Sequence, residues 1–275
     1  MNKIKRTLEK ALSEAGTILK RAMDQPKHIQ YKNKSPVSLV TKTDKAIEQR
    51  IIDIIHARFP HHAILAEESG STGPSTVSRS SAGSTLSRWL IDPLDGTTNF
   101  AHGLPCVCVS IAYEEGGVLK VGGVWNPFYK EWFWAEANKG ASLNGKKIRV
   151  SKTKSLSTSL LVTGFPYDRI ERAEYYLKIF KRFMVRTHGI RRLGSAALDL
   201  CYVACGRFDG YWEFNLAPWD QAAAGLIAQE AGATLSDFSG RPMSIYARQT
   251  LATNGRIHKE MLSVLRPLVA RRGTL

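Results

Sequence analysis

The chain has 275 residues, enough for a large core in one domain or in two tightly joined ones, and its composition is that of an ordinary globular protein. No apolar run approaches the roughly 20 residues of a membrane span, and the charged segment Met1–Glu14 lacks the apolar region of a signal peptide, so we expect a cytoplasmic protein without membrane contact. Lys and Arg outnumber Asp and Glu by 39 to 24, and this net charge of +15 suits anionic substrates as well as RNA or acidic proteins.

The four cysteines are too few to form a disulfide framework in a chain of this length. Cys106 and Cys108 lie two residues apart, and Cys201 and Cys205 are separated by one helical turn. No histidine has a useful zinc-binding spacing from either pair. Buried free thiols are therefore predicted, with a zinc site as the weaker alternative.

Two amphipathic helices are predicted near the N-terminus. Apolar residues at helical spacing indicate a helix over Ile4–Met23, and Lys27–Ser38 is typical of a polar loop. A second helix is predicted to open within Leu39–Asp44. Asp44 lies in its first turn, where an acid stabilises the helix dipole.

A short apolar strand is predicted over Ala63–Ala66, followed directly by two acids. Glu67 and Glu68 would point to opposite faces, so only one of them can reach a shared site. The segment Gly70–Arg88 is rich in Ser, Thr and Gly without periodicity, which indicates a flexible loop. The histidines of this region are interpreted as surface residues, not ligands: His56, His61 and His62.

The stretch Trp89–Phe100, W-L-I-D-P-L-D-G-T-T-N-F, carries the clearest chemistry. It begins as a buried strand, and Pro93 is expected to end the strand because proline cannot donate to the ladder. Asp92 and Asp95 are crowded around that proline, and two carboxylates repel each other unless a cation lies between them. Their hard oxygens suit Mg²⁺, or Mn²⁺, better than a soft metal.

A tight turn and a helix N-terminus are predicted directly after these acids, over Gly96–Asn99. The backbone N–H groups of Gly96 and Thr97 would form a cradle for an anion. A cation next to an anion cradle predicts a phosphate held against Mg²⁺. The competing interpretation is an ordinary strand-to-helix turn with Asp and Thr caps.

An antiparallel sheet is predicted in the middle of the chain. Its strands are Cys106–Glu114 and Val118–Trp125, joined by a hairpin at Gly116 and Gly117, and Glu131–Glu136.

A strand and two helices are predicted to follow. The strand covers Ser159–Phe165, and the first helix covers Arg169–Val185. The second begins within Gly194–Leu200 and is capped by Ser195.

The C-terminal part carries two more acids at the ends of predicted elements. Glu213 lies on a strand over Asp209–Phe214. Pro218 begins a helix, matching its preference for the first helical position, and Asp220 lies in the first turn ahead of small residues that let the helix approach closely. Ile257–Val269 is predicted to be a surface helix.

Three motifs, which follow one another along the chain in the same order as in the family, resemble those of the inositol monophosphatase family. Trp89–Phe100 resembles its first signature, Leu65–Ser69 (L-A-E-E-S) its E-E-S element, and Pro218–Gly225 (P-W-D-Q-A-A-A-G) its second signature, W-D-x-A-A-G, with one extra Ala. The resemblance extends from about Lys34 to Gly240 and is greatest to the bacterial SuhB-type members.

The resemblance implies a mixed α/β (α+β) fold of five layers, αβαβα, usually assembled as a homodimer. Residues 1–275 would form one catalytic unit, with a metal-site half at about 1–150 and a second half at 151–275. The implied activity is Mg²⁺-dependent hydrolysis of inositol 1-phosphate, sensitive to Li⁺.

The resemblance also assigns roles to individual residues. Asp44 and Thr97 would orient the attacking water, which Glu67 helps to activate, and Lys34 would lie beside the active site. Ligands for two or three Mg²⁺ would be Glu67, Asp92, the Leu94 carbonyl, Asp95 and Asp220. Substrate contacts would come from Glu67, Leu94, Asp95, Gly96, Thr97, Gly194, Ser195, Ala196, Glu213 and Asp220.

Two alternatives stay open at this stage. One is a related phosphatase acting on histidinol phosphate, fructose-1,6-bisphosphate or 3′-phosphoadenosine-5′-phosphate. The other is a SuhB-type transcription or ribosome-biogenesis factor that contacts RNA or RNA polymerase, which the net charge favours.

Overall fold

The computed structural model describes residues 1–25, 29–31, 39–72 and 86–269. The helices in this part of the chain are α1 (Asn2–Ala22), α2 (Lys42–His56), α3 (Thr97–Ala101), α4 (Arg169–Met184), α5 (Ala196–Ala204), α6 (Pro218–Glu230) and α7 (His258–Val269), with a 3₁₀ turn at Leu156–Thr158. No helix in these ranges has the length and apolar content needed to cross a membrane.

The larger sheet has eight strands in the order β10-β9-β8-β7-β6-β5-β3-β4. All neighbouring pairs are antiparallel except β3 and β5, which are parallel. The strands are β3 (Ala63–Ala66), β4 (Gly70–Thr72), β5 (Ser87–Asp95), β6 (Cys108–Glu115), β7 (Val118–Asn126), β8 (Glu131–Glu136), β9 (Gly140–Leu143) and β10 (Lys146–Lys147).

The smaller sheet has five strands in the order β12-β11-β13-β15-β14. Strand β11 is parallel to β12 and β13, and β15 is antiparallel to both β13 and β14. The strands are β11 (Leu160–Thr163), β12 (Gly189–Arg191), β13 (Gly210–Phe214), β14 (Thr234–Ser236) and β15 (Gln249–Thr253). A separate antiparallel pair joins β1 (Ile29–Tyr31) to β2 (Leu39–Thr41).

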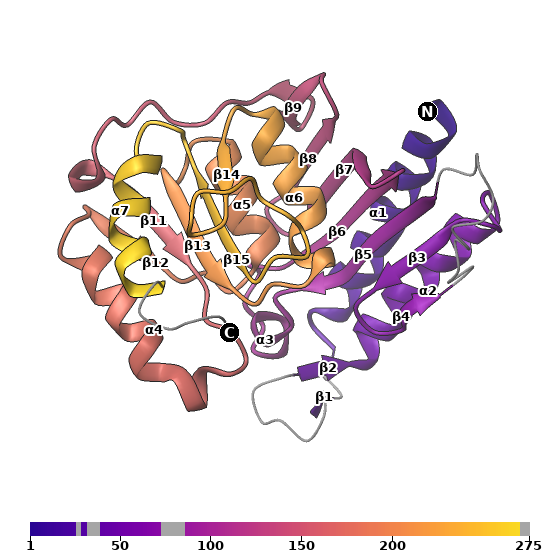
Figure 1. The fold of residues 1–275 in the computed structure, drawn as a ribbon. Coiled ribbons are helices and arrows are strands. Elements are labelled where there is room, and N and C mark those ends of the chain that lie inside the picture. The colour runs from indigo at the N-terminus through magenta and orange to yellow at the C-terminus, as the bar shows by residue number, and fades with distance from the viewer. Residues whose placement is uncertain (26–28, 32–38, 73–85, 270–275) are drawn as a thin grey trace, which may run out of the picture.

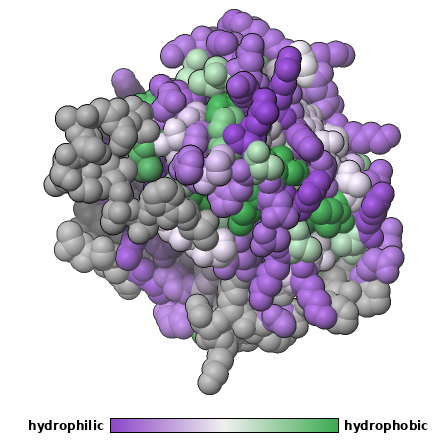
Figure 2. Space-filling view, turned by 90° about the vertical axis from the view of Figure 1, so that its right-hand side faces the viewer, coloured by the Kyte–Doolittle hydropathy of each residue, from purple (hydrophilic) through white to green (hydrophobic). Residues whose placement is uncertain are grey.

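The elements stack in five layers, which confirms the predicted αβαβα architecture (Figure 1). Helices α1 and α2 pack on one face of the large sheet, α5 and α6 fill the space between the two sheets, and α4 and α7 cover the outer face of the small one. The outer helices are amphipathic: α1 buries one stripe that includes Leu8, Leu12 and Leu19. On the side of α1 and α2, hydrophilic side chains predominate and hydrophobic ones form only small patches (Figure 2).

Pro93 does not end its strand, contrary to the sequence-based prediction. Strand β5 continues to Asp95, and its pairing with β6 shifts between Asp92 and Asp95. Proline removes one ladder hydrogen bond, but pairing resumes beyond it at Asp95 and Cys108. The irregularity places both acids next to a break in the ladder.

Both segments predicted to be loops are strands at their described ends. Ile29–Tyr31 pairs with Leu39–Thr41, and Gly70–Thr72 pairs with β3. The second helix accordingly begins at Lys42, because Thr41 serves as its N-cap. Lys34 and the central part of the segment Gly70–Arg88 lie outside the described residues.

The cysteines are free, as predicted, although Cys106 and Cys205 are only half-buried. His62 is half-buried, so its interpretation as a surface residue is only partly right. Its ring stacks on Phe59, and its Nδ1 accepts a hydrogen bond of 3.1 Å from the Trp89 indole. The sequence analysis missed β9, β10, β12, β14 and β15, which are strands of two to five residues with little apolar periodicity.

Helix α6 approaches the large sheet very closely. All residues from Gln221 to Ala228 are buried, and a Cβ added at Gly122 of β7 would lie 2.9 Å from both Cα and O of Ala223. Such a distance leaves no room for a side chain, so glycine on the strand and alanine on the helix set the spacing of the two layers. This spacing also fixes the height of Asp220 above the sheet.

We expect Gly122→Val to destabilise the protein by about 1–3 kcal/mol or more, because the added methyl groups overpack the contact with Ala223. Urea unfolding followed by circular dichroism measures the change. Val118→Ala at an exposed position of the same strand is the control and should leave the midpoint nearly unchanged. An unchanged midpoint for Gly122→Val would contradict the tight contact.

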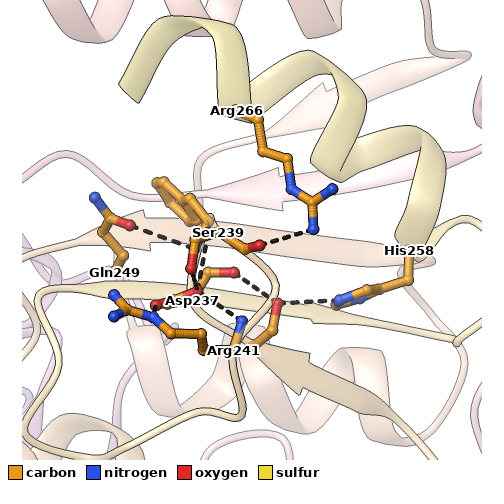
Figure 3. Close-up of polar contacts among 8 residues, drawn as sticks. Asp237, Ser239, Arg241, Gln249, His258 and Arg266 are labelled. Atoms are coloured by element: carbon orange, nitrogen blue, oxygen red, sulfur yellow. Dashed lines mark hydrogen bonds and ion pairs between the residues drawn. The ribbon is translucent and has the colours of Figure 1, made fainter. Parts of the chain in front are cut away.

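The loop after β14 is held by a network of polar contacts (Figure 3). Asp237 accepts hydrogen bonds from the backbone N–H groups of Ser239 and Arg241 at 2.8 and 2.9 Å. Arg266 of α7 donates to the Ser239 carbonyl at 2.7 Å. The imidazole of His258 lies between the hydroxyls of two strands, 3.0 Å from Ser236 Oγ and 3.0 Å from Thr253 Oγ1.

Burial, together with the nearby charge of Arg266, lowers the pKa of His258 below its ordinary value. As the pH falls through about 6.5, the unfolded chain takes up a proton that the folded chain does not, so the free energy of unfolding falls. We expect the stability difference between the wild type and His258→Gln to shrink from pH 7 to pH 5. Urea titrations at the two pH values measure it, and a constant difference would contradict this.

Candidate active site

The site is built around the turn between β5 and α3. Gly96 has a φ of 95° and precedes the first helical residue, Thr97. A Cβ at Gly96 would lie 3.0 Å from the Cys106 carbonyl and 3.3 Å from the Gly194 carbonyl, so glycine is required both for conformation and for space. The side chain of Asn99 crosses the same gap, donating to the carbonyls of Cys106 and Leu193 at 2.8 Å each.

The turn opens onto a cavity of about 690 Å³. Its wall contains residues from both sheets and from α5 and α6. Predicted site residues on this wall are Glu67, Asp92, Leu94, Asp95, Gly96, Thr97, Gly194, Ser195, Ala196, Glu213 and Asp220. Their proximity follows from the fold, while the role of each residue stays a prediction.

Asp44 is not on the wall but lies directly behind Thr97. It is fully buried, and its carboxylate accepts from the Thr41 backbone N–H at 2.8 Å and from the Thr41 hydroxyl. The Thr97 hydroxyl lies 3.1 Å from Asp44 Oδ1 and 3.1 Å from the Leu94 carbonyl oxygen. The hydroxyl has one proton and can donate it to Asp44, which is off the wall, so an oxygen lone pair is left to accept from a molecule in the cavity.

Asp95 connects the turn to the N-terminus of α5. Its Oδ2 accepts from the Ser195 hydroxyl and from the Ala197 N–H, each at 2.7 Å, and its Oδ1 accepts from the Ala196 N–H at 3.3 Å. The Ser195 hydroxyl also caps the helix by accepting from Leu198 N–H. One carboxylate therefore fixes the position of α5 relative to the turn.

Asp92 and Asp220 are each oriented by a backbone N–H group. Leu94 N–H donates to Asp92 Oδ1 at 3.0 Å, across the break in β5, and Ala217 N–H donates to Asp220 Oδ2 at 2.7 Å, at the start of α6. These contacts prevent the side chains from rotating away from the cavity.

The acids of the cavity oppose one another's ionisation. Burial raises the pKa of Asp92 well above its ordinary value, and the charges of Glu67, Asp95 and Asp220 raise it further. Burial also raises the pKa of Asp95, to about 6, although the hydrogen bonds from α5 act in the other direction. The pKa of Asp220 is raised by burial and then by Glu67 and Asp95. A positive charge between these groups would relieve the repulsion.

The residues of this cavity fit a hard divalent cation. Carboxylate and carbonyl oxygens are the donors that Mg²⁺ prefers, and Glu67, Asp92, Asp95 and Asp220 supply them together with the Leu94 carbonyl. Within the described ranges, no three Asp, Glu, His or Cys side chains stand close enough to enclose a single ion, so the fit concerns donor chemistry and not a closed cage.

Glu213 lies on the same wall, on β13. Burial raises the pKa of its carboxyl to about 7, and the Tyr211 hydroxyl donates to its Oε2 at 2.6 Å. A Cβ at Gly164 would lie 2.1 Å from Glu213 Oε1, so the glycine provides the space that this carboxyl occupies.

Gly164, Asn99, Asp199 and Arg192 also shape this region and were not predicted as site residues. Gly164 has no sequence signal, because its spatial neighbour Glu213 is 49 residues away in the chain. Asp199 did have a sequence signal, because it lies in the first turn of the helix that Ser195 caps.

Comparison with known proteins agrees with this geometry. The model of the inositol monophosphatase family matches residues 1–270. An inositol-1-monophosphatase of Synechocystis sp. is 45% identical over 255 residues, which cover 93% of this chain and 86% of that protein. The Nus factor SuhB of Pseudomonas aeruginosa is 41% identical over 260 residues, 94% of either chain.

A solved structure shows the same fold. The crystal structure of the extragenic suppressor protein suhB from Bartonella henselae superimposes with a TM-score of 0.86 at 35% sequence identity. The match covers 96% of this chain and 98% of the other.

Ser195→Ala removes both the cap of α5 and the hydroxyl donor to Asp95. We expect a loss of about 0.5–2 kcal/mol in the free energy of unfolding, because an N-cap hydroxyl contributes about that much. Chemical denaturation measures it. Ser195→Thr, which keeps the hydroxyl, should recover most of the loss, and Ser195→Ala with wild-type stability would contradict the contact.

Proposed function

Because the chain belongs to the inositol monophosphatase family, we propose that it hydrolyses a phosphate monoester, inositol 1-phosphate first among candidates, in the cavity next to the β5–α3 turn. The observation that carries the proposal is that Glu67, Asp92, Asp95 and Asp220, far apart in sequence, line one cavity together with Gly96 and Thr97 of the turn.

The cofactor of this proposal is Mg²⁺, with two or three ions per site and Mn²⁺ as a substitute. Glu67, Asp92, the Leu94 carbonyl, Asp95 and Asp220 would hold it. When bound, Mg²⁺ neutralises phosphate charge and acts as a Lewis acid toward the phosphoryl group. The acids support the assignment because their mutual repulsion favours cation binding.

The chain's own residues would place the reacting groups. The lone pair of the Thr97 hydroxyl accepts a hydrogen bond from the attacking water, and Asp44 holds that hydroxyl in place from behind. The N–H groups of Gly96 and Thr97 bind the phosphate at the positive end of the turn. Water adds to phosphorus, the bond from phosphorus to the ester oxygen breaks, and the alcohol leaves with a proton.

The leaving alcohol would lie toward β13 and α5. Glu213 accepts hydrogen bonds from its hydroxyls, and the backbone at Gly194, Ser195 and Ala196 forms the adjacent wall. This arrangement supports a polyol as the alcohol. A panel of inositol 1-phosphate, histidinol phosphate, fructose-1,6-bisphosphate and 3′-phosphoadenosine-5′-phosphate distinguishes the related phosphatase activities.

We expect phosphate release from inositol 1-phosphate to require Mg²⁺ and to fall by about a thousandfold or more in Asp95→Asn, because catalysis of this very slow reaction depends on charge stabilisation in the site. A colorimetric phosphate assay measures release, and circular dichroism checks the fold.

Asp53→Asn, on the outer helix α2, serves as the control and should retain full activity. Near-wild-type turnover by Asp95→Asn, or turnover that is indifferent to chelation of Mg²⁺, would refute the proposal.

A second role in transcription or ribosome biogenesis is a further candidate. It is favoured by the net charge of +15 and by the relative named Nus factor SuhB. Salt-sensitive RNA or RNA polymerase binding that survives in Glu67→Ala would separate this role from catalysis. Homodimer assembly, Li⁺ inhibition and division near residue 150 remain predictions from the resemblance, and cytoplasmic location remains a prediction from the sequence pattern.

A further inference from the structure

Asp199 is a buried acid on the cavity wall that the proposed chemistry does not use. It lies in the first turn of α5, four residues after the capping Ser195. Its side chain is 1% exposed, yet it lines the same cavity as Asp95 and Glu213. Its carboxyl therefore lies at the cavity wall, with both oxygens almost entirely shielded from solvent.

Neither carboxylate oxygen of Asp199 has a hydrogen-bond partner among the described residues. Its neighbours differ: Asp95 accepts three hydrogen bonds, and Glu213 accepts one from Tyr211. Leaving a buried polar group unpaired costs about 1–3 kcal/mol, and more for a charged one. A hydrogen-bond donor on a bound ligand would satisfy this carboxyl.

The charges around Asp199 indicate which ligand this is. Glu213 and Asp95 repel its negative charge, and Arg192 attracts it. No cation is proposed between Asp199 and Glu213, so these two acids would repel a substrate phosphate but not neutral hydrogen-bond donors. Hydroxyl groups of the alcohol part are the donors that a phosphate monoester can supply at this end.

We propose that Asp199 is a specificity-determining residue that accepts hydrogen bonds from hydroxyls of the leaving alcohol, beside those accepted by Glu213. This rests on the proposed phosphatase function and adds a second acceptor for the hydroxyls of its alcohol part. A carboxylate accepts at both oxygens and a carboxylic acid still accepts at its carbonyl oxygen, so the role does not depend on its protonation.

Cyclohexyl phosphate and inositol 1-phosphate test the proposal, because the first has the same ring and ester but no ring hydroxyls. We expect Asp199→Leu, which is nearly isosteric, to lower kcat/KM for inositol 1-phosphate by about tenfold to a hundredfold, mainly through KM. For cyclohexyl phosphate we expect a change of less than about twofold. The preference for the polyol should therefore collapse.

Two variants accompany this measurement. Asp199→Asn keeps one acceptor, should give an intermediate preference, and serves as the test should Asp199→Leu not fold. Cys205→Ala, at the C-terminal end of the same helix and away from the cavity, should leave the preference unchanged.

Equal losses for both substrates, or no change for either, would overturn the role of Asp199 while leaving the phosphatase proposal standing. If the wild type hydrolyses none of the phosphate monoesters of the panel with Mg²⁺, the proposed function fails and this inference fails with it. If the preference for inositol 1-phosphate over cyclohexyl phosphate is lost only in the Asp199 variants, the result supports both the phosphatase function and the role of Asp199.

Discussion

The site depends on one carboxylate, that of Asp95, because it is shared between two layers. It comes from a strand of the large sheet and is held by the hydroxyl and N–H groups at the start of α5, which packs between the sheets. The turn that would bind phosphate and the helix that would contact the alcohol are thus fixed relative to each other. The glycines at 96 and 194 let the two backbones meet at that point.

The same cavity gathers acids that raise one another's pKa, and the fold must hold them in place. Backbone N–H groups orient Asp92 and Asp220, and the tight packing of α6 on β7 leaves the latter little freedom to withdraw. Repulsion in the metal-free protein and affinity for cations are two consequences of this one arrangement. The repulsion among these acids lowers the stability of the fold at the site where the acids are needed for function.

Sequence motifs located the acids that line the cavity at β5 and α6, whereas other residues of the wall were not predicted. Asp92, Asp95 and Asp220 lie in short motifs whose local chemistry is readable, and the layered fold followed from resemblance. Gly164 acquires meaning only through Glu213 on another strand, which one sequence does not reveal, and the position of Asp199 in the first turn of α5 does not by itself place it on the cavity wall. The prediction at Pro93 was wrong because the proline interrupts the β5–β6 ladder without ending the strand. Strands as short as β10 and β12 form through pairing with a neighbouring strand, and so few residues show no hydrophobic alternation in the sequence.

The break in β5 and the start of α6 are separated by a long stretch of chain, and this matters during synthesis. Asp95 leaves the ribosome 125 residues before Asp220. At about 5–20 residues per second, this delay lasts roughly 6–25 s. The nascent polypeptide therefore carries three of the four acids first, and the cavity is complete only when α6 has been made and packs on the large sheet.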